Sequence, residues 1–422
     1  MKIKSKFKFL SKLAAVAAAA VVPTTASAVQ GDADLLSILV KKGTLTAEEA
    51  NEIKKSSAVA PVFVEQGNPV IRISGKFQGQ YEYLYVNGLE GVDGSATVSK
   101  FIPRRVILTF KTDEKRDWGA QLSFDFILPH KMSVTYMWKR VETSYAKGEF
   151  RFGYVKSNFN VEEYMSPFNL YCVERSIATY YWGGPKNARR LGLASFHTGA
   201  YWLGKSQIVD GLNYVLGVSN AKNYEISQID SDNAPNLYFA VSQKLDFDDV
   251  KILLGVNLGW GADANGYAAN SSTAGMWGAN PYASLDWNAL RAMAEFLVSG
   301  VDEGRNLDGS YGRQFPVGLN AMVEYKFDIG EFGKLAPAFR FTYLDTDGRG
   351  VTPSDGLRHT KNIAGDSPYK RATGYYGGVN WYLRGNNLKF MLGYEYTHFD
   401  GGAYGAHEAE ENSVRSMVQV LF

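Results

Sequence analysis

The sequence predicts an all-β fold, a 16-stranded antiparallel transmembrane β-barrel with a short N-terminal periplasmic helical segment. Three observations predict this fold. Apolar and polar side chains alternate with a period of two after residue 70, many of the alternating runs reach ten residues or more, and short connections alternate with long ones. A tilted strand needs about ten residues to cross a membrane. Short turns on one side and long loops on the other are typical of up-and-down outer-membrane barrels.

Residues 1–28 predict a signal peptide for export. Five lysines and no acid precede an apolar, alanine-rich run, and Ala26-Ser27-Ala28 is a small-residue cleavage site. The apolar run is too short to span a bilayer as a helix, which disfavours the alternative of a retained signal anchor. Removing these five lysines changes the formal net charge from +2 to −3. The mature chain is therefore not basic, and nucleic-acid binding has no support.

Residues 29–69 predict a periplasmic helical segment followed by a linker. Apolar residues recur at helical spacing, at Leu35, Leu36, Leu39 and Val40. Thr46-Ala47-Glu48-Glu49 then reads as a capping box that opens a second short helix. The pattern favours a helical hairpin or a short coiled coil within residues 32–57, and contact with the cell wall is the alternative. Pro61 and Pro69 indicate a linker after it.

Residues 70–422 predict the barrel domain. In VIRISGKFQGQYEYLYV most odd positions from Ile71 to Tyr85 are apolar or aromatic, and the even positions from Arg72 to Glu82 are polar. Runs of this kind predict sixteen strands, at 70–86, 101–112, 117–127, 132–145, 148–157, 189–199, 211–219, 235–246, 249–260, 278–287, 289–299, 313–327, 332–345, 371–384, 387–399 and 413–422.

A soluble β-sandwich is the competing fold, because its strands also alternate. Its strands have ordinary length, however, and it does not require aromatic residues near the strand ends. This chain has them, at Tyr83, Tyr85, Trp118, Trp260, Trp287 and Trp381. Aromatic girdles at both membrane interfaces explain that placement. The sequence therefore predicts contact with lipid, in the outer membrane of a Gram-negative-type bacterium.

The last strand supports a closed wall. SVRSMVQVLF alternates to its final residue, Phe422. Lipid offers no water to an unpaired strand, so we expect this strand to pair with the first one. Phe422 then faces lipid at the periplasmic rim.

A barrel of this size is too wide to be filled by its own inward side chains, so it should enclose water. Inward positions carry both signs of charge, and counting them leaves ion preference open. The lumen-facing candidates are Arg72, Lys76, Arg151, Lys326, Arg340 and Lys389, together with Asp125, Arg291 and Glu295.

The longest connection, residues 158–188, is too long to be only a turn, and we expect it to fold inward and narrow the pore. It carries the constriction candidates Glu162, Glu163, Glu174 and Arg175. The alternative for each is a solvated loop charge, and Glu174-Arg175 could equally be a structural ion pair.

The sequence gives little support for catalysis, and no cofactor is expected. Cys172 is the single cysteine and cannot form an internal disulfide, and the five histidines lack the spacing of a metal site. A barrel lipase or protease would need a nucleophile beside a histidine, and His398 has no obvious partner.

Several motifs resemble the phosphate-selective porins O and P. The resemblance is carried by the Arg104-Arg105 pair, Arg116-Asp117-Trp118, the strand end Gly153 to Lys156, and Glu174-Arg175, in that order. It covers the first half of the barrel best. It implies a homotrimer of sixteen-stranded barrels that passes small anions, with arginines and a lysine at the constriction. Arg104 and Arg105 match the arginine pair.

Two departures from the family pattern bear on function. By alternation Arg105 faces the lumen, whereas Arg104 faces outward unless a bulge near Pro103 re-aims it. In addition, Glu163 stands where phosphate-selective members place a lysine, and a carboxylate there would repel a dianion.

The sequence therefore predicts an outer-membrane porin, general or mildly anion-preferring, that passes small hydrophilic solutes and ions. A phosphate or polyphosphate channel is the alternative. A structural or adhesive barrel is a third interpretation, in which residues 32–57 would be the working part.

Overall fold

The structure, a computed structural model, describes residues 62–64, 71–89, 95–112, 117–127, 132–183, 189–220, 235–262, 275–355, 367–402 and 408–422. The chain divides into two compact units, Met1–Pro61 and Val62–Phe422, and the second contains all the described residues. The predicted signal peptide and the predicted helices within 32–57 lie outside the described residues.

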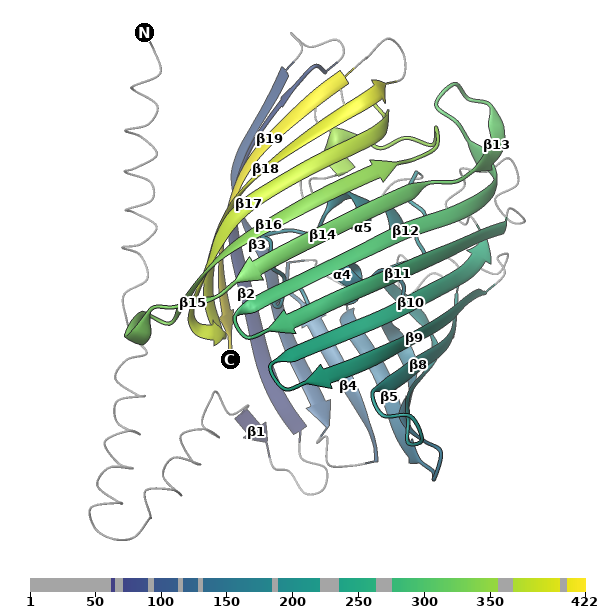
Figure 1. The fold of residues 1–422 in the computed structure, drawn as a ribbon, viewed down its shortest axis with the longest axis vertical. Coiled ribbons are helices and arrows are strands. Elements are labelled where there is room, and N and C mark those ends of the chain that lie inside the picture. The colour runs from purple at the N-terminus through teal and green to yellow at the C-terminus, as the bar shows by residue number, and fades with distance from the viewer. Residues whose placement is uncertain are drawn as a thin grey trace. The chain divides into compact units, whose positions relative to one another are not determined.

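Sixteen strands form the wall of a closed antiparallel barrel (Figure 1). They are β2 (Ile71–Asn87), β3 (Ser95–Thr112), β4 (Trp118–Asp125), β5 (Met132–Glu142), β6 (Ala146–Lys156), β7 (Phe196–Ser206), β8 (Leu212–Ser219), β9 (Asn236–Phe247), β10 (Val250–Ala262), β11 (Gly275–Trp287), β12 (Leu290–Arg305), β14 (Val317–Tyr325), β16 (Lys334–Asp345), β17 (Tyr369–Asn386), β18 (Leu388–Gly402) and β19 (Glu408–Leu421). Three short strands extend the pairing at strand ends: β1 (Val62–Val64), β13 (Tyr311–Gln314) and β15 (Phe327–Asp328).

The barrel closes where β19 pairs with β2, from Glu410 opposite Asn87 to Leu421 opposite Lys76. The Phe422 amide donates to the Gly75 carbonyl at 2.9 Å, and the Gly75 amide donates back at 2.6 Å. The Phe422 ring lies over Gly75, where a Cβ atom would come within 2.2 Å of it. The predicted pairing of the last strand with the first is therefore confirmed, and it gives the facing edges of β19 and β2 the partner that a membrane interior requires.

The two faces of the wall differ in polarity. On β18 and β19 the outward Leu392 and Tyr394 are exposed, whereas the inward Arg415 and Gln419 are buried. Exposed aromatic residues gather at both ends of the strands. Trp118, Trp287 and Tyr325 lie at the end with the short turns, and Tyr83, Trp260 and Trp277 lie at the end with the long loops. These positions match the two girdles of a barrel in lipid.

Two short helices and two 3-10 turns complete the described elements, α4 (Val161–Tyr164), α5 (Ile177–Trp182), η1 (Gly330–Phe332) and η2 (Pro353–Asp355). Among the described residues, no helix is long and apolar enough to cross a membrane.

One predicted strand is misplaced. The strand expected at 189–199 begins at Phe196 and runs to Ser206. Leu191 and Leu193 alternate with glycine and alanine as a strand would, but both side chains are buried in a cluster inside the barrel. Their backbone continues the preceding loop, because the Leu191 amide donates to the Tyr181 carbonyl at 3.0 Å. The alternating Leu191 and Leu193 therefore belong to a packed loop and not to a lipid-facing strand.

The lipid-facing side should reject charge at mid-depth. We expect Leu392→Arg to lower the free energy of unfolding by about 2–4 kcal/mol, the cost of a cation facing hydrocarbon. Urea titration of the protein folded into vesicles measures this loss. Ser74→Arg, at an inward position of β2, is the matched control and should cost much less. Equal losses in both variants would contradict the assignment of the two faces.

Candidate functional site

The connection between β6 and β7 lies inside the barrel, and we call its described residues, 157–183 and 189–195, the inward loop. It contains α4 and α5 (Figure 1). Asn160 caps α4 by accepting from the Glu163 amide at 3.0 Å, and Ser176 caps α5 by accepting from the Thr179 amide at 3.1 Å. All six side chains of α5 are buried, and the Trp182 indole donates to Ser299 Oγ on β12 at 2.7 Å. The loop packs against the inner wall.

Glu162 fastens the inward loop to this wall. Its Oε1 atom lies 3.3 Å from Arg340 Nη1 on β16. Its Oε2 atom accepts from Ser176 Oγ at 2.8 Å and from Asn320 Nδ2 at 3.0 Å. Both charged side chains are almost fully buried. Burying either charge alone would be costly, so each side chain requires the other.

Glu174 binds a second part of the wall through Arg104. The Arg104 guanidinium faces both carboxylate oxygens, with Nη2 at 3.2 Å from Oε2. Arg104 can face inward because it is an extra residue in β3: Gln78 pairs with Arg105, whereas the next residue, Gly79, pairs with Pro103. This β-bulge reverses the alternation, so that two consecutive arginines are buried on the lumen side.

Arg105 lies beside the bulge and donates from Nη1 to Gln78 Oε1 at 2.6 Å. The two arginines that resemble the family pair therefore differ in role. Arg104 is held by a carboxylate of the inward loop, and Arg105 is held against β2.

Glu163 and Arg175 pair within the inward loop. Arg175 Nε lies 3.1 Å from Glu163 Oε2, and the same guanidinium donates to the backbone carbonyls of Glu162 at 2.9 Å and Met165 at 2.7 Å. Lys156 Nζ on β6 lies 3.9 Å from Glu163 Oε1. The Glu163 carboxylate, expected from the sequence to oppose a dianion, is thus buried between two cations.

The Glu162 contact continues as a chain of buried ion pairs across the wall. Arg340 Nη2 lies 2.6 Å from Glu395 Oε1 on β18, and Glu395 Oε2 lies 2.8 Å from Arg415 Nη1 on β19. Arg415 Nε lies 2.9 Å from Glu82 Oε1 on β2. We call these five residues, Glu162, Arg340, Glu395, Arg415 and Glu82, the charge chain.

Three of the predicted lumen-facing cations lie on the covered wall. Lys389 is fully buried, and its Nζ donates to the Phe168 and Leu170 carbonyls of the inward loop at 3.4 and 3.2 Å. Arg340 is buried in the charge chain. Lys326, near the short turns, lies 3.7 Å from the buried Glu324. Of these three, Arg340 and Lys389 are closed off from solutes by the loop.

The other three predicted lumen-facing cations, Arg72, Lys76 and Arg151, lie on β2 and β6 and keep part of their surface exposed. An inward side chain that keeps some exposure borders space that solvent can enter. Lys111 on β3 joins them, directly opposite Arg72. Lys76 Nζ lies 5.2 Å from the centre of the Phe168 ring on the inward loop. No carboxylate of the described ranges lies within ion-pair distance of Lys76.

A second long connection, between β16 and β17, holds the inward loop from the long-loop end. Arg190 Nη2 lies 2.9 Å from Asp355 Oδ1, and the Arg190 guanidinium stacks over the Tyr180 ring at 3.5 Å. Arg349 Nε donates to the Arg189 carbonyl at 2.6 Å. The inward loop is therefore anchored at its start, middle and end.

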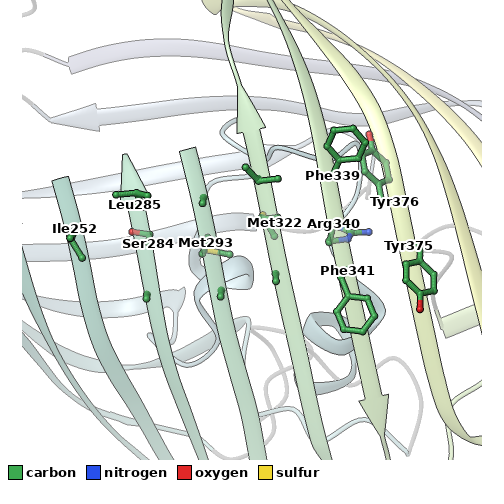
Figure 2. A pocket seen from close by; sticks show the side chains of 15 residues that line it. Ile252, Ser284, Leu285, Met293, Met322, Phe339, Arg340, Phe341, Tyr375 and Tyr376 are labelled. Carbon is green, nitrogen blue, oxygen red and sulfur yellow. The ribbon is translucent and has the colours of Figure 1, made fainter. Parts of the chain in front are cut away.

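An apolar hollow of about 760 Å³ lies on the opposite, outer surface of the wall. Figure 2 shows Ile252 and Leu285 at one edge and Phe341 and Tyr375 at the other. Its floor is a cross-strand row of alanines, Ala283, Ala294 and Ala321. Because these outward side chains face hydrocarbon, the hollow is not the path of hydrophilic solutes. Within the described part of the chain, no group of histidine, cysteine and acidic side chains is placed to hold a metal ion.

Sequence reasoning missed three members of the charge chain, Glu82, Glu395 and Arg415. Their inward direction was readable from the alternation. Their pairing was not, because Arg415 and Glu82 are 333 residues apart and meet only when the barrel closes.

The anchoring of the inward loop can be tested through Cys172. The thiol is buried, and burial raises its pKa to about 12, so a hydrophilic thiol reagent should not modify it at neutral pH. Glu162→Ala leaves Arg340 without this partner and should cost about 3–5 kcal/mol in the free energy of unfolding. We expect Cys172 to become reactive in that variant. Glu142→Ala, at the exposed end of β5, is the control; an unreactive thiol in Glu162→Ala would refute the anchor.

Comparisons with known proteins agree with this architecture. No curated protein sequence matches the chain. Among solved structures, the outer membrane channel DcaP of Acinetobacter baumannii has a TM-score of 0.52 and 12% identity, covering 86% of this chain and 100% of that one. An anion-selective porin from Comamonas acidovorans has a TM-score of 0.52 and 10% identity, covering 83% and 100%. At these identities the likeness shows the fold alone.

The family described as phosphate-selective porin O and P matches residues 309–422. The match covers the last strands of the barrel, whereas the motifs that resembled this family lie in its first half. The recognition of the family is confirmed by a different part of the chain from the one that prompted it. The C-terminal strands thus have the sequence character of the phosphate-selective porins O and P, on a barrel with the fold of outer-membrane porins.

Proposed function

We propose that this protein is an outer-membrane diffusion porin with a mild preference for anions. Small hydrophilic solutes and ions pass between the inward loop and strands β2 to β6, down their concentration gradients. The matched family is one of channels and not of enzymes.

The observation that carries the proposal is the unequal distribution of charge inside the barrel. The carboxylates of the inward loop, Glu162, Glu163 and Glu174, each lie against a cation and are buried. Strands β2 to β6 keep partly exposed inward cations at Arg72, Lys76, Lys111 and Arg151. The inward carboxylates of these strands are fewer: Glu82 lies 2.9 Å from Arg415, Glu149 is engaged by Arg151 at 2.6 Å, and Asp125 accepts from the Ile127 amide at 3.1 Å. A passing ion therefore meets a positive wall.

Selectivity for phosphate is the alternative, favoured by the family match. A guanidinium presents a planar fork to phosphate oxygens and stays charged at any relevant pH. In this chain, however, Arg104 and Arg175 already bind carboxylates. These two arginines hold the inward loop in place, so a phosphate would have to displace a buried carboxylate from them.

We further propose a chain organised as signal peptide 1–28, periplasmic segment 29–69 and barrel 70–422, assembled as a homotrimer in the outer membrane of a Gram-negative-type bacterium. These assignments rest on the sequence pattern and the family resemblance. Electrophoresis of the unheated protein in detergent tests the trimer.

The preference for anions should depend on Lys76. We expect the wild-type protein in planar bilayers to give an anion-selective reversal potential in a potassium chloride gradient. Lys76→Glu should lower the anion-to-cation permeability ratio by about fivefold, because a nearby unit charge acts on an ion with roughly 1 kcal/mol even in water. Lys147→Glu, at the exposed start of β6, is the control. A protein that never conducts would end the proposal.

The alternative makes a different prediction for block by phosphate. We expect phosphate to block the wild-type chloride current only weakly, because the two arginines are occupied. In the double variant Glu163→Gln with Glu174→Gln, Arg104 and Arg175 lose their carboxylate partners. Phosphate should then block the chloride current at about tenfold lower concentration. Strong block of the wild-type channel by low phosphate would favour the alternative.

A further inference from the structure

One pair of neighbouring strands in the wall is not joined by a local connection. Each of the other pairs joins wall strands that follow one another in the chain, whereas β19 and β2 are the last wall strand and the first. Gln419 and Gln78, which lie directly opposite each other in this pair, are 341 residues apart. A short connection keeps two strands close after their hydrogen bonds open, and a long one does so less well. We call the β19–β2 pair the closure seam.

The inward loop crosses the closure seam on the lumen side. The Gln78 side-chain amide on β2 donates to the Pro167 carbonyl at 3.3 Å, and also to Gln419 Oε1 at 2.8 Å. The Gln419 side-chain amide on β19 donates to the Phe168 carbonyl at 3.1 Å. Both glutamine side chains are buried. Two consecutive carbonyls of the loop thus bind one strand from each side of the seam, and we call residues 167–171 the clasp.

The clasp continues over the next two strands. Lys389 Nζ on β18 donates to the Phe168 and Leu170 carbonyls at 3.4 and 3.2 Å. Asn380 Nδ2 on β17 donates to the Tyr171 carbonyl at 2.7 Å. Side chains of β17, β18, β19 and β2 therefore all donate to backbone carbonyls of the clasp. These bonds depend on the path of the clasp backbone and not on its own side chains.

The clasp lies close to the end of the closure seam. β19 reaches Leu421 opposite Lys76, and Gln419 opposite Gln78 is only two residues further in. Lys76 Nζ lies 5.2 Å from the centre of the Phe168 ring of the clasp. The short turns that join other strands lie at this same end of the barrel. The clasp is therefore placed near the point where a turn would join β19 to β2.

We propose that the clasp takes the place of this missing turn and locks the barrel closed. The side chains of the four strands reach its carbonyls together only when β19 lies beside β2, so the inward loop takes its final position only in a closed barrel. In return, the seam cannot open at this end without leaving buried amide groups unpaired, which is costly. Opening of the wall and displacement of the loop are then one event.

Hydrogen exchange of the backbone amides tests the lock on the full chain folded into vesicles. Gln78→Ala with Gln419→Ala removes the side-chain bonds across the seam and those to the clasp. We expect amide exchange in β19 and β2 to become about tenfold faster, because opening of the seam then breaks fewer hydrogen bonds. Thr109→Ala with Ser123→Ala is the matched control. It removes a buried 2.9 Å bond between β3 and β4, which follow one another in the chain, and should leave exchange at the seam unchanged.

A variant of the inward loop alone separates the clasp from the bonds within the seam. Arg175 lies on this loop and donates to the Met165 carbonyl at 2.7 Å, two residues before the clasp. Arg175→Met keeps every side chain of β2 and β19, and it should still speed exchange at the seam by about threefold. Exchange at the wild-type rate in this variant would overturn the proposal. Acceleration of equal size in all strands would also overturn it, since that result shows only a loss of overall stability.

Cys172 reports the loop side of the same event, because it follows the clasp directly in the chain. In Gln78→Ala with Gln419→Ala we expect a hydrophilic thiol reagent to modify this buried side chain about tenfold faster than in the wild-type protein, in step with exchange at the seam. A thiol that stays unreactive while the seam exchanges faster would show that wall and loop open separately, and would overturn the lock. Neither readout requires conduction, so failure of the lock and failure of the porin function are distinguishable.

Discussion

The structure depends on the matching of buried charges between the inward loop and one wall of the barrel. An ionised carboxylate removed from water costs several kcal/mol unless a cation and further donors meet it. Glu162, Glu163 and Glu174 all satisfy this condition, and the charge chain extends it to β2. The loop cannot leave the wall without uncovering these groups.

Most of the fold could be predicted from the sequence because the lipid acts on each strand separately. Every strand must offer apolar side chains outward, so the period-two pattern is local and readable without knowledge of neighbours. One segment of the chain alternates in the same way without forming a strand. Leu191 and Leu193 show the same alternation but pack beside Trp182 inside the lumen. A packed loop and a lipid-facing strand impose similar patterns over a few residues, and only the partner surface tells them apart.

The candidate site was less predictable, because its chemistry depends on pairs and not on single residues. Arg104, Glu163 and Arg175 could be chosen from the sequence, but their ionic partners could not. Glu163 in isolation suggested repulsion of anions; beside Arg175 and Lys156 its charge is balanced.

The bulge in β3 has a consequence for how such a pore can evolve. On either side of Arg104 the wall keeps its hydrophobic exterior. The extra residue only changes whether the even-numbered or the odd-numbered residues of β3 face the lumen. Gain or loss of a single codon there adds or removes an interior charge without rewriting the membrane-facing surface. Permeation and membrane compatibility are thereby decoupled at this position, so selection can adjust one property while the other stays fixed.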